Sequence, residues 1–283
     1  MELKRRFIFH GHAVAIGGRI VRPEDVILDP KCASALSVTG GRTSSSLKAT
    51  RFGKYVRFAS AATLAEGLFD STKQAIALTH KRVREDELTS TTTVRAEVSG
   101  LVIGVDGLLT AERVRGSLTA KSPAAADAET AIRLGKDTTI DGVAVGDHKL
   151  IVELNKGLFQ EFDTYSKLRR AAEDSKFASE HAGSLLTRAT AVAGQPRGAG
   201  LIEARGTCHG TIVKSIRWRG KPYPGATIDE HTVHVPDFGR IYFGEILIKS
   251  DSRRLTMMRL ELGSAAGGSA AAGEVEDNGS WSP

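Results

Sequence analysis

Cysteine is scarce in this sequence: Cys32 and Cys208 are the two cysteines among 283 residues. Two cysteines cannot build a disulfide framework. They can form one bridge if the fold brings them together, and two buried free thiols are the commoner case. Long apolar runs are missing as well, since no segment approaches the roughly 18 consecutive apolar residues of a membrane-spanning helix. The sequence therefore predicts no transmembrane segment.

The overall composition excludes several classes of protein. Hydrophobic residues make up 41% of the chain and charged residues 25%. These fractions are typical of soluble globular proteins, and they argue against wholesale disorder, collagen and a coiled coil.

Catalytic signatures are also missing. There is no Gly-x-Ser-x-Gly nucleophile elbow, and neither cysteine stands in a recognisable protease context. Residues 40–46 (GGRTSSS) resemble a phosphate-binding loop in composition, but the lysine and the spacing of that loop are absent. We therefore assign no catalytic, cofactor-binding or metal-binding residues from motifs, and their absence favours a protein that is not an enzyme.

The net charge is unevenly distributed along the chain. It is +6 in total, yet residues 264–283 contain Glu274, Glu276 and Asp277 and no basic residue, which leaves +9 on the remainder. Such a surplus could attract nucleic acid, an anionic polysaccharide or a membrane surface through long-range electrostatics, and it could equally belong to an ordinary solvated surface. No zinc finger, aromatic RNA-binding signature or basic helix accompanies the charge, so nucleic acid is a poor candidate partner.

Strand periodicity dominates the sequence. Residues 7–16 alternate as a first strand that ends at a Gly17-Gly18 turn, and residues 91–98 alternate with one polar face. Asp106-Gly107 predicts a tight reversal of the chain. Later strands are expected at residues 150–154, 211–218, 232–235, 241–248 and 255–262.

Helical patterns are few. The main one covers residues 163–181, with Asp163 as the expected N-cap, and a shorter one covers residues 124–134. The Gly- and Pro-containing residues 193–200 predict a linker, and residues 264–283, rich in Gly, Ala and Ser, predict a flexible tail. The resulting division is an N-terminal β segment packed on the core (1–90), a first β repeat with the helical insertion (91–192), the linker (193–200), a second β repeat (201–263) and the tail (264–283).

An internal repeat supports this division. Strand, x-Gly turn, strand and Gly turn follow one another in residues 117–159 and again in residues 211–241. Repeated β units bury their faces against neighbouring units. The sequence therefore predicts a mainly β fold of packed antiparallel sheets or stacked β-units, with a short helical insertion.

Four segments resemble bacterial choice-of-anchor P proteins. They are VRAEVSGL at residues 94–101, GLLTAERV at 107–114, TVHVPDFGRIY at 232–242 and LTMMRL at 255–260, so the resemblance covers roughly residues 90–262. It implies a β-rich, surface-associated bacterial module without established catalytic residues. This sequence departs from that pattern by lacking a signal peptide and a sorting tail.

The expected location follows from two opposed observations. The basic residues 4–6 precede an apolar stretch that contains His10 and His12 and has no convincing cleavage site, so we interpret it as a strand and not as a signal peptide. Without a signal peptide the default location is cytoplasmic. The family resemblance implies the cell surface instead.

Histidines are the first candidates for a metal site. His10 and His12 are two residues apart and would share a strand face, which supplies half of a zinc or copper site, with Cys208 and His209 as further ligands. Two hydrogen-bonded core histidines are the competing interpretation. His231 and His234 would point to opposite faces of a strand.

Glu245 is the candidate general acid. It stands among apolar residues, which can raise the pKa of a carboxyl group, and Asp229 or Glu230 would be its partner. An outward-facing strand residue paired with Arg or Lys is the competing and favoured interpretation.

The sequence as a whole favours a non-enzymatic bacterial structural or surface-associated protein that acts by self-assembly or binding. Exposed sheet edges would recruit further copies into a homo-oligomer or fibre, and the Thr and Ser faces at residues 89–93 suit such packing. The first alternative is a carbohydrate-active hydrolase that uses buried carboxylates such as Glu245. The second is a pore-forming or membrane-contacting β protein whose residues 46–103 refold as hairpins.

Overall fold

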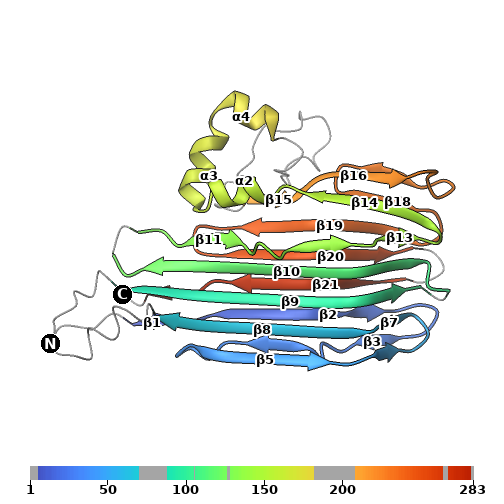
Figure 1. The fold of residues 1–283 in the computed structure, drawn as a ribbon, viewed down its shortest axis with the longest axis horizontal. Helices are drawn as coiled ribbons and strands as arrows, with labels where there is room; N and C mark the ends of the chain where they lie inside the picture. The colour runs from blue at the N-terminus through green and yellow to red at the C-terminus, as the bar shows by residue number, and fades with distance from the viewer. Residues whose placement is uncertain are drawn as a thin grey trace.

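The computed structural model describes residues 6–69, 88–104, 106–125, 128–181, 208–263 and 267–281. Two large antiparallel sheets pack face to face, and a short helical excursion lies at one side of them (Figure 1). Strands account for 62% of the structure and helices for 9%. The prediction of a mainly β fold built from antiparallel sheets is confirmed.

The larger sheet has eleven strands. Its order runs from β5 through β8, β9, β10 and β13 to β14 and β16; β7 and β6 extend it beside β9, and the short strands β11 and β12 also pair with β10. The bounds are β5 (Gly41–Leu47), β6 (Thr50–Phe52), β7 (Val56–Phe58), β8 (Ser60–Phe69), β9 (Thr89–Ile103), β10 (Leu109–Pro123), β11 (Ala131–Leu134), β12 (Thr139–Asp141), β13 (Ala144–Val145), β14 (His148–Leu154) and β16 (Val213–Arg219).

The smaller sheet has nine strands, and a separate two-stranded sheet joins β1 (Phe7–Ile8) to β22 (Ser280–Trp281). Its order is β17, β18, β19, β20, β21, β2 and β3, with β15 beside β19 and β4 beside β2. The bounds are β2 (Gly11–Ile20), β3 (Val26–Leu28), β4 (Ala33–Ala35), β15 (Cys208–Thr211), β17 (Thr227–Asp229), β18 (Thr232–Val235), β19 (Gly239–Ile248), β20 (Arg253–Leu262) and β21 (Gly268–Asp277).

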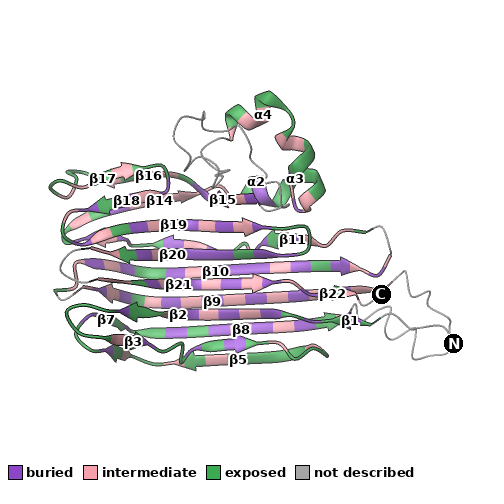
Figure 2. Ribbon diagram, turned by 180° about the vertical axis from the view of Figure 1, so that it is seen from behind, coloured by how far each residue is buried: buried purple, intermediate pink, exposed green. Residues whose placement is uncertain are grey.

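The β9–β10 hairpin is the centre of the larger sheet. Val94, Ala96 and Val98 point into the space between the sheets and are fully buried, as their alternation predicts. Gly107 adopts φ 69°, so the predicted reversal at Asp106-Gly107 occurs between the two strands. Figure 2 shows the resulting bands of buried and less buried residues along the strands.

The alternation of faces shifts by one residue near the middle of several long strands. Gly100, Gly244 and Gly273 stand at this point with φ of 61°, 60° and 68°, a region that favours glycine. In β9, the consecutive buried residues Val98 and Leu101 are therefore three positions apart, whereas the buried residues on either side of them are two positions apart. The shift divides the outer face of the larger sheet into two regions, and the site described below lies on the side that follows Gly100.

The helical excursion contains α2 (Lys156–Glu161), α3 (Tyr165–Ala172) and α4 (Ser175–Glu180). The predicted helical insertion is thus confirmed, but the predicted cap is wrong. Thr164 and Asp174 cap α3 and α4, whereas Asp163 is buried and binds Arg133 and Lys167.

The prediction of a helix at residues 124–134 is also wrong. The second part of this segment forms β11, in which buried Ile132 and Leu134 alternate with half-buried Ala131 and exposed Arg133. Pairing with β10 gives these apolar side chains the burial that an isolated short helix would lack.

The prediction of a flexible tail is wrong for residues 268–281. β21 lies between β20 and β2 in the interior of the smaller sheet, and its Ala270, Ala272 and Val275 face the core. The small residues permit close approach: a Cβ at Gly18 would lie 2.3 Å from the carbonyl oxygen of Ser269. The predicted turn at Gly17-Gly18 is also wrong, because both glycines lie within β2.

The two sheets combine strands from every predicted unit. β2 from the N-terminal segment pairs with β21, and β14 from the first half pairs with β16 from the second. The chain passes from the smaller to the larger sheet at Ile212, between β15 and β16. The linker predicted at residues 193–200 lies outside the described residues. Among the described helices, none has the length and apolar character needed to cross a membrane.

Candidate functional site

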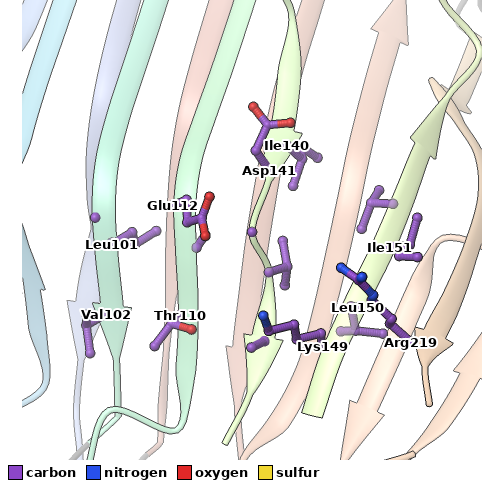
Figure 3. Close-up of a pocket in the computed structure, with 16 residues that line it drawn as sticks. Leu101, Val102, Thr110, Glu112, Ile140, Asp141, Lys149, Leu150, Ile151 and Arg219 are labelled. Atoms are coloured by element: carbon purple, nitrogen blue, oxygen red, sulfur yellow. The ribbon is translucent and has the colours of Figure 1, made fainter. Parts of the chain in front are cut away.

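A groove of about 610 Å³ opens on the outer face of the larger sheet (Figure 3). Strands β9, β10, β13, β14 and β16 contribute to its lining, together with the end of β12. Three kinds of side chain meet there: apolar, acidic and basic. The apolar side chains are Val102, Ala144 and Ile151, the acidic ones are Glu112 and Asp141, and the basic ones are Lys149 and Arg219.

Gly142 shapes the acidic side of the groove. It follows β12 with φ 62°, and a Cβ at this position would lie 2.2 Å from Cγ of Glu112. The absence of a side chain at Gly142 therefore gives the Glu112 side chain room to lie across the backbone. Asp141 accepts a hydrogen bond of 2.7 Å from the Thr139 hydroxyl.

Strand register aligns seven residues of this face in one row, which we call the cross-strand row. Each member is the direct partner of the next, across the strands β6, β7, β9, β10, β13, β14 and β16. Direct partners in antiparallel strands project from the same face. The members are Arg51, Arg57, Val102, Thr110, Ala144, Lys149 and Arg219.

The basic members of the cross-strand row stand in two pairs, at its two ends. Arg51, Arg57, Lys149 and Arg219 are all exposed. A second, smaller hollow lined by Arg51, Arg57 and Asp106 meets the groove at Val102. Within the part of the chain that the structure describes, none of these four basic side chains forms an ion pair.

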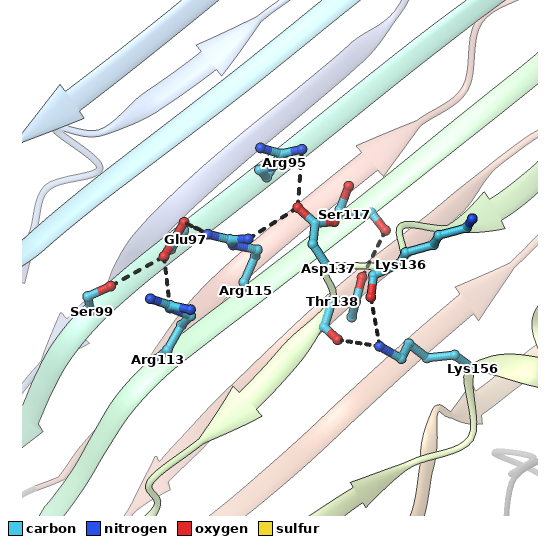
Figure 4. A network of polar contacts seen from close by, with 10 residues as sticks. All are labelled: Arg95, Glu97, Ser99, Arg113, Arg115, Ser117, Lys136, Asp137, Thr138 and Lys156. Atoms are coloured by element: carbon cyan, nitrogen blue, oxygen red, sulfur yellow. Dashed lines mark hydrogen bonds and ion pairs between the residues drawn. The ribbon is translucent and has the colours of Figure 1, made fainter.

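The other region of the same face is different, because its charges are paired (Figure 4). Arg115 contacts Glu97 at 2.6 Å and Asp137 at 3.3 Å, while Arg113 contacts Glu97 at 3.2 Å. Arg95 contacts Asp137 at 3.1 Å. These ion pairs join β9, β10 and the turn between β11 and β12, and they neutralise the surface beside the groove.

Glu245 lies on the outer face of the smaller sheet and does not fit the role of a general acid. Its two carboxylate oxygens accept hydrogen bonds of 2.6 and 2.9 Å from Arg259, and one lies 3.8 Å from Nε2 of His231. Burial raises the pKa of Glu245, but the hydrogen bonds from Arg259 and the proximity of His231 outweigh burial and lower it to about 2. The prediction of a raised pKa is wrong, and the favoured interpretation of a strand residue paired with arginine is confirmed.

Further contacts hold the Glu245 cluster in place. Arg259 also contacts Glu261 at 2.6 Å, and its guanidinium lies 3.8 Å from the centre of the Tyr242 ring. Tyr242 donates a hydrogen bond of 2.7 Å to Glu261. The cluster borders a hollow of about 600 Å³, but each of these carboxylates is already engaged by a cation or a hydroxyl.

The residues proposed for metal binding do not come together. His10 and His12 have ring centres 6.3 Å apart, with His10 exposed and His12 3.9 Å from Glu276. Cys208 and His209 lie in β15, which is separated from β2 by β19, β20 and β21. The described residues contain no group of three or more His, Cys, Asp and Glu side chains placed to hold a metal ion. Cys32 and Cys208 are both buried and form no disulfide bridge.

The edge of the larger sheet is the second surface of interest. Residues 41–47, within the segment that resembles a phosphate loop in composition, form β5, whose only strand partner in the described part of the chain is β8. Two side-chain hydrogen bonds link β5 to the smaller sheet, from Thr43 to the Ala35 carbonyl and from Cys32 to the Ser45 carbonyl. Neither uses an N–H group of β5. Residues 89–93, whose Thr and Ser faces are expected to suit packing between copies, pair on both sides in β9 and so form no sheet edge.

Sequence reasoning missed the cross-strand row completely. Its basic residues come from three parts of the chain, at Arg51 and Arg57, at Lys149 and at Arg219, and belong to no charge cluster. The available signal was their position: each occupies an outward site of a short polar-faced strand. Strand register, which joins them, is not visible in a single sequence.

A family model described as "Domain of unknown function (DUF8256)" matches residues 7–249. No curated protein and no solved structure gives a significant match.

Proposed function

We propose that this chain, which belongs to the family of the domain of unknown function DUF8256, is a non-enzymatic structural protein. In this proposal it pairs with a second copy of itself through β5. The observation that carries this proposal is the single strand partner of β5. An unpaired strand edge presents N–H and C=O groups that another strand can bind. The proposed location at a bacterial cell surface rests on the resemblance to choice-of-anchor P proteins.

The composition of β5 supports its choice over the other edges. β5 and β16 are the longest strands with a partner on one side only in the described residues, each with seven residues. β16 carries Lys214, Arg217 and Arg219, and such charges oppose strand addition. β5 carries one charged residue, Arg42, followed by four small hydroxyl side chains, so it is the less protected edge.

Antiparallel pairing of two β5 strands would have a definite symmetry. The two-fold axis would pass near Ser44, the central residue of β5, and stand perpendicular to the sheets. The contact uses the same surface of both copies, so it closes as a dimer and does not propagate into a fibre. The outer faces of the larger sheets of the two copies would point to the same side of the dimer.

The mass of the purified chain in solution tests this proposal. We expect light scattering to show a concentration-dependent species of about twice the 30.2 kDa of one chain. Ser44→Lys should return it to one chain, because the two introduced ammonium groups would lie close together across the axis. Ser44 is exposed, so the substitution should leave the circular dichroism spectrum unchanged.

The matched control is Thr227→Lys, which places the same charge in the exposed edge strand β17. It should leave the dimer intact. A single-chain mass at every concentration would contradict the proposal. A dimer that survives Ser44→Lys would also contradict it. Loss of the dimer in Thr227→Lys alone would show that the two copies meet at the edge of the smaller sheet instead.

A further inference from the structure

The cross-strand row holds positive charge that the protein itself does not neutralise. A few residues away on the same face, every arginine of the network around Glu97 and Asp137 contacts a carboxylate. Arg57 and Lys149 have no such partner among the described residues. The fold thus pairs its charges in one region and leaves the adjacent region with four unpaired cations.

The geometry of the row suits an elongated ligand. Neighbouring strands are about 4.8 Å apart, so Arg57 and Lys149, four strands apart in the order, are separated by about 19 Å along the row. Arg51 and Arg219 extend it to about 29 Å by the same spacing. A small anion could contact one end at a time, whereas a polymer lying across the strands could contact both.

The middle of the groove indicates which kind of polymer. Glu112 and Asp141 supply carboxylate oxygens that accept hydrogen bonds from hydroxyl groups, and Thr110 can both donate and accept. Val102 and Ile151 add apolar surface beside them. Sugars carry hydroxyl donors and apolar ring faces, so this lining matches a carbohydrate.

A nucleic acid fits the same lining poorly. Its continuous line of phosphates would pass close to Glu112, Asp141 and, at the Arg57 end, Asp106. The groove also lacks aromatic lining residues on which bases could stack. The carboxylates in the middle therefore favour a ligand whose negative charges are spaced and whose remaining groups are hydroxyls.

We propose that the groove and the cross-strand row form a binding site for an anionic polysaccharide that lies across the strands, with its carboxylates at the two basic ends and its hydroxyls at Glu112 and Asp141. This site does not depend on pairing through β5. A monomeric chain would retain one complete groove.

Calorimetric titration with hyaluronan oligosaccharides, which carry a carboxylate on every second sugar only, tests the proposal on the full chain. We expect binding that weakens as salt concentration rises, and no binding of an uncharged cello-oligosaccharide of the same length. Arg57→Gln and Lys149→Gln should each weaken binding roughly tenfold, because each removes one charge-assisted hydrogen bond. A hyaluronan disaccharide, too short to contact both ends, should bind much more weakly than the long oligomer.

The control is the double variant Lys176→Gln/Lys249→Gln, which removes two exposed basic residues outside the groove. It should bind like the parent chain, whereas Arg57→Gln/Lys149→Gln should not. Equal losses of affinity in both double variants would show that binding depends on net charge alone, and would overturn the proposed site. Tighter binding of single-stranded DNA than of the hyaluronan oligosaccharide would overturn the carbohydrate as ligand. An effect of Lys149→Gln without one of Arg57→Gln would overturn the extended pose.

Discussion

Asp277 is a buried carboxyl group at the end of β21. Its side chain is 1% exposed, and Oδ1 has no hydrogen-bond partner among the described residues. Burial raises the pKa of Asp277 to about 7, although hydrogen bonds from Gly279 and Thr92 act in the opposite direction. The folded chain therefore keeps a proton on Asp277 at pH values where the unfolded chain has released it.

This difference makes stability depend on pH. Because the pKa is higher in the folded state, the folded state is favoured at low pH and loses stability as pH rises from about 4 to about 7. Asp277→Asn removes the ionisable group, so we expect the variant to be more stable than the parent above pH 7, by roughly 4 kcal/mol at most. Urea unfolding at pH 5 and at pH 8 measures the change.

The exposed Asp251→Asn provides the control and should unfold like the parent at both pH values. Equal stabilisation by Asp277→Asn at pH 5 and pH 8 would show that ionisation of Asp277 is not the cause.

Single residues also show where sequence reasoning ends. The apolar neighbours of Glu245 were visible in the sequence, but its partner Arg259 lies on the adjacent strand, fourteen residues later. The sign of the pKa change was determined by that partner and not by the neighbours. Candidate acids in strands therefore require knowledge of the facing strand.

At the scale of elements, Arg253 attaches the helical excursion to the sheets. Its side chain is 2% exposed and donates hydrogen bonds to the carbonyl oxygens of Ile132, Phe159 and Phe162, in β11, α2 and the end of α2. Burial lowers the pKa of Arg253 to about 10, so the guanidinium stays charged at neutral pH, with Asp163 favouring that charge. One side chain of β20 thus joins two separate backbone segments, β11 and the C-terminal part of α2.

Arg253→Met keeps an unbranched apolar side chain and removes the guanidinium with its donors. We expect a loss of roughly 3 kcal/mol in the free energy of unfolding, because buried carbonyl groups lose their partners. Hydrogen exchange should become faster in α2 and β11 before it changes in β9. The exposed neighbour Arg254→Met should leave both measurements unchanged, and uniform acceleration in Arg253→Met would show that the attachment is not local.

The strands divide into those that the sequence predicts and those that it does not. β9, β14, β18, β19 and β20 follow from the alternation of branched apolar residues with polar ones. β21 does not, because its Gly and Ala side chains have little hydrophobic signal and are buried only after β2 and β20 close around them. Its small residues satisfy a packing requirement that originates in its neighbours.

At the scale of the whole molecule, β21 pairs with both β2, an early strand in the sequence, and β20, a late one. Removing residues 264–283 would take away β21 and β22, and would leave β2 and β20 without their common neighbour. We expect a chain that ends at Gly263 to lose cooperative thermal unfolding and to aggregate. A chain that ends at Trp281 is the control and should unfold like the parent. A sharp unfolding transition in the shorter chain would show that β21 is dispensable.

The candidate site belongs to this scale too. Its four basic residues come from β6, β7, β14 and β16, and the pairing of seven strands is needed to align them. The sequence indicated the fold class and a positively charged surface. The position of that charge follows from register, which a one-residue slip in any strand would change.

The place of β21 in the sheet also has a consequence in time. β2 is synthesised about 250 residues before β21, its neighbour in the sheet. At roughly 5–20 residues per second, the interval lasts roughly 10 to 50 seconds. Throughout it, β2 lacks its neighbour on this side, whereas β20 is completed only a few residues before β21. A nascent chain on the ribosome therefore exposes one long unpaired edge, that of β2, until β21 emerges.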